Sequence, residues 1–136
     1  NKANYTHDMI AKTGKFVVSI ISQNADFELF KHFGFQSGRD TNKFENFSDC
    51  ATTENGICYI TKGTNGYISV NVEKTQDLGS HTMFVADVLN IHADEKYMDE
   101  NGRFCLEKAD PVCYSHGTYF TMGKKLGTFG YSVKKK

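Results

Sequence analysis

The chain alternates short apolar segments with breaks rich in glycine and asparagine, and the period of the apolar positions changes along it. Residues 15 to 22, KFVVSIIS, are almost all apolar or β-branched, which predicts a buried strand. In residues 67 to 76 and 81 to 93 apolar and polar side chains alternate, which predicts two half-buried strands. Asp77-Leu78-Gly79 reverses the chain between them, so we expect an antiparallel hairpin.

Two segments have the pattern of short helices. Residues 4 to 12 predict a helix with Asn4 or Thr6 at its N-cap and Gly14 at its C-cap. Residues 25 to 33 place phenylalanine and leucine at helical spacing, which predicts a second short helix.

The remaining segments indicate a protein made mostly of strands. Residues 35 to 47 carry Ser, Gly, Arg, Asp, Thr and Asn in succession, as in a loop or turn. ICYIT at 57 to 61 predicts another strand, and Asn65-Gly66 predicts a tight turn that joins it to the strand starting at Tyr67. The expected fold is mostly β with short helices, closed or sandwiched so that strand edges are protected.

Composition narrows the function without assigning one. At 136 residues the chain is expected to form a single domain, residues 1–136. The charges of sixteen basic and sixteen acidic residues cancel, so the protein has no net electrostatic attraction for nucleic acid or for a membrane surface. No apolar run approaches the ~20 residues that a membrane span requires. The four cysteines are Cys50, Cys58, Cys105 and Cys113. Their spacing is too wide for a zinc knuckle, and we interpret them as reduced thiols of a cytoplasmic protein.

The common catalytic motifs are absent from the sequence. There is no glycine-rich dinucleotide or phosphate loop, no nucleophile elbow and no zinc-protease motif, and the five histidines do not fall at metal-ligand spacing. If the protein is an enzyme, its redox chemistry is expected to reside in a bound cofactor.

Three stretches together resemble one family: NKANYTHDMI (1 to 10), FGFQSGRDTNKF (33 to 44) and GSHTMFVADV (79 to 88). They are similar to the flavin reductase-like group of FMN-binding split β-barrels, which includes flavoredoxins and rubredoxin-linked flavin domains. The resemblance covers nearly the whole chain and implies a Greek-key antiparallel barrel with short peripheral helices. Ala86 and Asp87 stand where the family has glycine and glutamate. Family members carry further early strands before the position of Asn1, so the chain is expected to be N-terminally incomplete relative to the family, either as a fragment or as a domain completed by another chain.

The resemblance also implies a flavin site, and each residue in it has a plainer reading. Polar groups at a helix start can bind phosphate or merely cap the helix, Ser-Gly-Arg-Asp is also a common surface turn, and a histidine beside a turn is often structural. Under the family reading His81 lies near the flavin or the nicotinamide approach as the catalytic candidate, acting by hydrogen bonding and positioning. Tyr5, Phe33 and Phe35 are assigned to the core. The cofactor-binding candidates are Lys2, Asn4, Thr6, Ser37, Gly38, Arg39, Lys43, His116 and Tyr119.

The function expected from this resemblance is electron transfer through FMN. The donor would be NAD(P)H or a partner reductase, and the acceptor a flavin or a redox protein such as a rubredoxin, with the protein a homodimer. No metal, nucleic acid or membrane partner is expected. The alternatives are a split-barrel module that binds a cofactor without turnover, and a fragment that has lost its flavin site.

Overall fold

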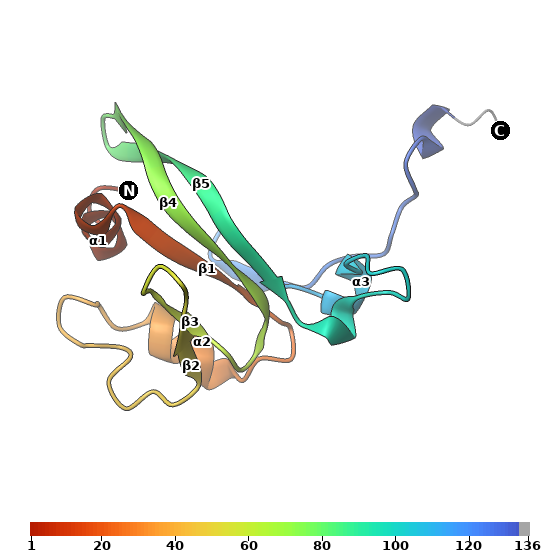
Figure 1. Cartoon of the computed structure of the whole chain (residues 1–136), viewed down its shortest axis with the longest axis horizontal. Coiled ribbons are helices and arrows are strands. Elements are labelled where there is room, and N and C mark those ends of the chain that lie inside the picture. The colour runs from red at the N-terminus through yellow and green to blue at the C-terminus, as the bar shows by residue number, and fades with distance from the viewer. Residues whose placement is uncertain (134–136) are drawn as a thin grey trace.

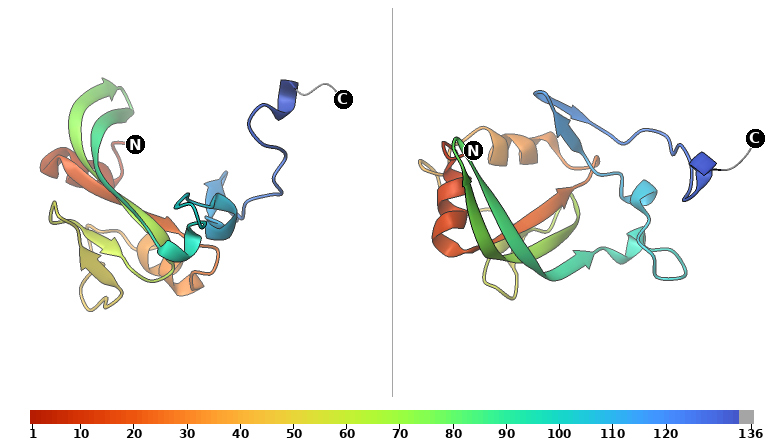
Figure 2. Two further views of the ribbon diagram at one scale, coloured as in Figure 1. Left: turned by 45° about the vertical axis from the view of Figure 1, so that its right-hand side comes forward. Right: turned by 90° about the horizontal axis from the view of Figure 1, so that it is seen from above.

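Three antiparallel strands form the main sheet of the computed structural model, which describes residues 1–133 (Figure 1). The strands are β1 (Lys15–Ile21), β4 (Thr64–Leu78) and β5 (His81–Ala93), in the order β1-β4-β5. β4 and β5 form the long hairpin that the alternating pattern predicted, with Leu78 opposite His81. The register shifts twice along their pairing, and such irregularities bend a sheet, in keeping with the curved ribbon of Figure 2.

Strand β1 differs in burial from its prediction. It occupies the expected segment, but its side chains are only half-buried and Val18 is exposed. A continuous apolar run predicts burial on both faces, whereas β1 packs β4 on one edge and leaves part of its surface uncovered.

The predicted turn at Asn65-Gly66 is wrong. Both residues lie inside β4, where Gly66 is paired with Ile20 of β1 and Ala93 of β5. The predicted strand at 57 to 61 exists as β3 (Cys58–Ile60), but it pairs with β2 (Cys50–Thr52), a strand that the sequence pattern did not reveal.

Both predicted helices are present. α1 (Tyr5–Thr13) has Asn4 at the N-cap position and ends at Gly14, whose φ of 66° is the left-handed conformation expected of a C-cap glycine. α2 (Phe27–Gly34) begins at Asp26, whose side chain accepts a hydrogen bond from the Glu28 amide.

Shorter elements complete the described chain. A 3₁₀ helix η1 (Glu95–Tyr97) and the one-turn helix α3 (Leu106–Ala109) follow β5, and the hairpin of β6 (Cys113–Ser115) with β7 (Thr118–Phe120) comes next. None of the helices within residues 1–133 combines the length and apolar character needed to cross a bilayer. The four cysteines are free thiols.

Few large apolar side chains are buried. The buried apolar residues are Ile60, Tyr67, Val70, Tyr97 and Ala109. By contrast β5 exposes a row of apolar side chains, and Ile91 at the end of that row is 67% exposed. Phe35, assigned to the core from sequence, is 85% exposed because it lies just beyond the end of α2, where the chain turns into the following loop.

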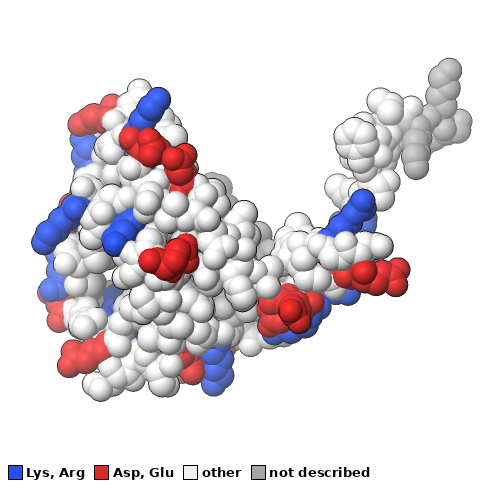
Figure 3. Space-filling view, viewed as in Figure 1, with Lys and Arg blue, Asp and Glu red and all other residues white. Residues whose placement is uncertain are grey.

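The last described segment leaves the body of the molecule. After β7 the chain runs outward as an extended arm that ends in the 3₁₀ helix η2 (Tyr131–Val133), as Figure 1 shows. In Figure 3 charged groups of both signs gather at the base of this arm, and residues 126–133 beyond it carry no charged side chain.

Candidate functional site

The opening segment and helix α1 bring three of the candidate residues together. Asn4 occupies the N-cap position, but its side chain makes no capping hydrogen bond. The His7 amide donates to the Asn4 carbonyl at 3.0 Å, which leaves the Tyr5 and Thr6 amides of the first turn for another acceptor. Thr6 lies in that first turn and lines a pocket of about 570 Å³. Lys2 is turned the other way, where its ammonium forms a 2.6 Å ion pair with Asp77 of β4. The segment therefore joins the start of α1 to the β4–β5 hairpin.

The loop 35–47 places Arg39 against the same helix. The guanidinium forms a 2.8 Å ion pair with Asp8 and lies 4.9 Å over the ring of Tyr5. The Ser37 hydroxyl accepts a 3.2 Å hydrogen bond from the Arg39 amide, which folds the loop into a tight turn. At Gly38 an added Cβ would stand 3.0 Å from the Tyr5 ring, so glycine lets the loop approach α1 closely.

Lys43 connects the loop 35–47 to helix α2. Its ammonium donates a 2.5 Å hydrogen bond to the Phe33 carbonyl at the end of α2, and its own carbonyl lies 2.6 Å from Nε2 of His32. Lys43 thus lines the pocket while anchoring the loop to α2.

Two residues that the sequence analysis did not single out connect these parts. Nε2 of His7 lies 2.9 Å from the Thr82 hydroxyl of β5, and its Nδ1 lies 3.1 Å from the Asp8 carboxylate. The hydrogen bonds from His7 and then from Arg39 lower the pKa of the Asp8 carboxyl below its ordinary value. Asp8 is therefore ionised at neutral pH and holds Arg39 in place. In the sequence, the only signal for this segment was the similarity of its residues YTHD to the family's sequences.

His81 begins β5 at the turn of the hairpin. It is exposed, and its Nδ1 lies 2.9 Å from the hydroxyl of Ser80. The carbonyl of Ser80 accepts a 3.1 Å hydrogen bond from the Lys2 amide, so His81 stands beside the opening segment. The Lys2 ammonium and then the Gly79 amide lower the pKa of Asp77 in this turn.

His116 and Tyr119 lie elsewhere. They belong to the β6–β7 hairpin, where the Tyr119 ring packs edge-on against Phe30 of α2 at 5.0 Å. His116 has a positive φ of 50° in the turn between the strands, and its Nδ1 contacts the Ser115 hydroxyl at 2.8 Å. Neither lines the pocket of Thr6 and Arg39.

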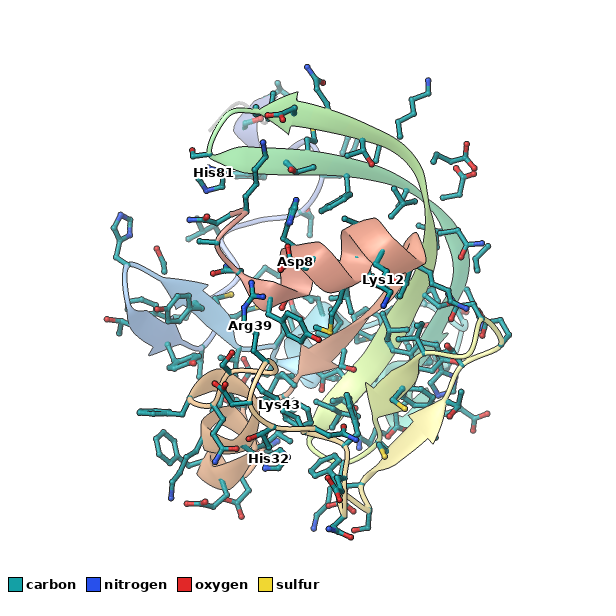
Figure 4. The ribbon with its side chains drawn as sticks, turned by 90° about the vertical axis from the view of Figure 1, so that its left-hand side faces the viewer. Asp8, Lys12, His32, Arg39, Lys43 and His81 are labelled. Atoms are coloured by element: carbon teal, nitrogen blue, oxygen red, sulfur yellow. The ribbon has the colours of Figure 1, made fainter. Side chains whose placement is uncertain are left out.

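The pocket combines a polar rim, which carries two basic groups and one acidic group, with apolar walls. Its apolar lining comes from Tyr5, Met9, Phe33 and Phe44, and its polar lining includes the acidic Asp40 beside two cations: Thr6, Arg39, Asp40, Thr41, Asn42 and Lys43. Figure 4 shows the β4–β5 ribbon arching over α1, with His81, Asp8, Arg39 and Lys43 on the side of the molecule that faces the viewer. Such a pocket has the size and the mixed character of a cofactor site, with donors for an anion and a slot for a planar ring.

Comparisons with known proteins agree on one family. Residues 1–123 match the family model described as "Flavin reductase like domain". The high molecular weight rubredoxin of Moorella thermoacetica is 33% identical over 88 residues, 65% of this chain and 38% of that protein. The ferric-chelate reductase (NAD(P)H) of Archaeoglobus fulgidus is 30% identical over 90 residues, 66% of this chain and 53% of that protein.

A solved structure shows the same fold. The flavoredoxin of Desulfovibrio vulgaris (Miyazaki F) superposes with a TM-score of 0.80 at 24% identity, over 98% of this chain and 73% of that one. The matched regions of the two sequence relatives amount to about half of their length or less.

Proposed function

Because the chain belongs to the flavin reductase-like family, we propose that it binds FMN and passes electrons from NAD(P)H or a redox partner to a flavin or an acceptor protein. One observation carries the proposal most directly: the opening segment, the arginine turn and the β4–β5 hairpin meet around α1, beside a pocket whose rim includes Arg39 and Lys43. These are the three stretches whose sequence resembles the family.

The pocket fits the two halves of FMN. The N–H groups at the start of α1, the Thr6 hydroxyl and the Arg39 guanidinium supply donors for a phosphate, where the helix dipole also favours an anion. The apolar walls suit the face of a planar ring. When bound, FMN supplies the site with an acceptor for hydride from a reduced nicotinamide.

The other candidates take supporting roles in this proposal. Lys2 and Ser37 hold the opening segment and the arginine turn in place, and Lys43 anchors the loop to α2. His81 is exposed at the head of β5 and positions a nicotinamide by hydrogen bonding. His116 and Tyr119 lie on the β6–β7 hairpin, outside the pocket, and would contact the flavin ring only from the face that the pocket does not cover.

The proposed electron donor, acceptor and oligomeric state are those expected of a flavin reductase-like protein. The rubredoxin-named relative supports a redox protein as acceptor, and the NAD(P)H-dependent reductase supports a nicotinamide as donor. A homodimer in the cytoplasm, acting as a single domain without nucleic acid or membrane partners, completes the proposal.

Titration of the purified chain with FMN tests the proposal. We expect quenching of flavin fluorescence, a shift of the visible flavin spectrum, and NAD(P)H oxidation that depends on bound FMN. Binding without NAD(P)H oxidation would instead identify a cofactor-binding module. A chain that takes up no FMN would rule out the flavin site and favour the fragment that lacks one.

A further inference from the structure

The C-terminal arm exposes apolar side chains that the body of its own chain does not cover. Four of them are largely exposed, with fractions of 87% at Leu126, 105% at Phe129, 56% at Tyr131 and 82% at Val133. Burying a side chain of this size stabilises a protein by about 1.5–3 kcal/mol, so a bare row of four is costly in water. An apolar segment of this kind indicates a binding surface.

The end of the arm has a structure of its own. A Cβ at Gly127 would collide with the Tyr131 ring, so the ring packs directly on that glycine. The amide of Tyr131 donates to the Thr128 carbonyl at 3.0 Å, and the amide of Val133 donates to Gly130 at 3.2 Å. A segment that is already folded loses less conformational entropy when it binds.

A cavity of matching character lies at the foot of the β4–β5 hairpin. It has a volume of about 630 Å³ and is lined by apolar side chains that include Ile20, Ile68, Ile91, Met98, Phe104 and Leu106. Asn65, which also lines it, is 1% exposed, and neither its amide nitrogen nor its amide oxygen has a hydrogen-bond partner. Leaving such groups unpaired costs about 1–3 kcal/mol each. We call this cavity the Asn65 pocket.

The charges around the two surfaces are complementary. Residues 94–110, which run along the Asn65 pocket and supply part of its lining, contain six acidic residues and three basic ones. Residues 121–136 contain five lysines and no acidic residue. One contact between these segments already exists, a 2.8 Å ion pair of Lys125 with Glu107 on α3.

We propose that the arm, residues 126–133, docks into the Asn65 pocket of a second copy of this chain, and that two copies exchange their arms. Lys125 fixes the base of the arm at α3, which supplies part of the lining of the chain's own pocket. Beyond Lys125 the arm runs outward from the body of the molecule (Figures 1 and 2). Reciprocal exchange about a twofold axis fills both pockets and covers both arms.

Site-specific photo-crosslinking in a defined heterodimer tests the exchange. Two copies with different affinity tags are co-expressed, benzoylphenylalanine replaces Phe129 in one of them, and the pair is purified through both tags and irradiated. We expect a covalent dimer whose crosslink joins position 129 to Met98, Phe104 or Leu106 of the other copy. A crosslink to the same residues within one chain, a crosslink outside the pocket, or failure of the tags to co-purify would each overturn the proposal.

A matched pair of serine variants tests the energetics. Phe129→Ser is expected to raise the dissociation constant of the dimer roughly tenfold to hundredfold in sedimentation equilibrium. Phe35→Ser makes the same chemical change at a phenylalanine that is also exposed but outside the arm and the pocket, and should leave the constant unchanged. Equal effects of the two variants, or none from Phe129→Ser, would contradict arm exchange. Neither experiment depends on FMN, so its failure would leave the proposed FMN binding and electron transfer untouched.

Discussion

Arg39 already has an anionic partner, and this affects how it would bind FMN. Its guanidinium is paired with Asp8 at 2.8 Å and supported by the Tyr5 ring. An arriving phosphate must share the guanidinium with that carboxylate or take it over. A guanidinium offers several donors in a fixed fork, so it can serve two anions, whereas the ammonium of Lys2 is engaged with Asp77 on the other side of the segment. Arg39 is therefore the cation of this site best placed to recognise a phosphate.

Replacing Arg39 should weaken FMN binding and leave riboflavin binding almost unchanged. Arg39→Ala removes a charge-assisted hydrogen bond to phosphate, which is expected to cost about 1–3 kcal/mol in FMN affinity. Riboflavin has the same ring system and no phosphate, so the loss should be confined to FMN. Fluorescence titration with both flavins measures the two dissociation constants.

Arg103 provides the control for this comparison. It is the only other arginine of the chain, it lies in the exposed turn after η1, and Arg103→Ala should leave both constants as they were. An equal loss of FMN and riboflavin in Arg39→Ala would show that Arg39 supports the fold of the loop and does not contact the phosphate.

At the scale of elements, the β4–β5 hairpin determines where the site residues lie. It carries Asp77, Ser80 and Thr82, which contact the opening segment and α1. At the other end of the hairpin β4 lies between β1 and β5, and Gly66 is paired with Ile20 on one side and with Ala93 on the other. A side chain there would strike the carbonyl of His92.

Gly66→Ala should destabilise the protein by about 2–4 kcal/mol, because the added methyl group forces β4 and β5 apart. Denaturant unfolding followed by circular dichroism measures the change. Gly34→Ala is the matched control: it lies at the end of α2 with no atom near an added Cβ, and alanine favours a helix. Its stability should equal or slightly exceed that of the parent chain. A Gly66→Ala variant as stable as the Gly34→Ala variant would mean that β5 moves away without cost.

The same glycine illustrates what local sequence could predict. Alternating apolar positions identified β4 and β5, and capping residues identified α1, because these signals are local. The dipeptide Asn65-Gly66 is also a local signal, and it predicts a turn. In the structure β1 and β5 pair with β4 on both sides at Gly66, so the dipeptide is part of an extended strand.

The site is held together by contacts between residues far apart in the sequence, which local sequence patterns cannot predict. The contact of His7 with Thr82 spans 75 positions and the pair of Asp8 with Arg39 spans 31, so they arise only from packing. The resemblance to a family located Thr6 and Arg39, but the residues that hold them, His7 and Asp8, were not identified. His116 and Tyr119 were grouped with them by family context, although they lie on a separate hairpin.

At the scale of the whole described chain, residues 1–133, few apolar side chains are buried, while β5 and the arm expose many. The stability of a folded domain is a small difference between large opposing terms, so a chain with this surface should gain noticeably from any ligand that binds only the folded state.

FMN should therefore raise the melting temperature in a concentration-dependent way. At a free FMN concentration about 100 times the dissociation constant, linkage predicts about 2.7 kcal/mol of added stability, which corresponds to roughly 10 °C for a chain of this length. Differential scanning fluorimetry across an FMN series measures the shift. Since Arg39→Ala weakens binding, its melting curve should need a roughly tenfold to hundredfold higher FMN concentration for the same shift, while its temperature without FMN stays close to that of the parent. That second condition separates binding from folding: Asp8 and Arg39 form an exposed pair, and exposed pairs contribute little to stability. A variant that melts far below the parent without FMN would show instead that the arginine turn holds the fold together at α1.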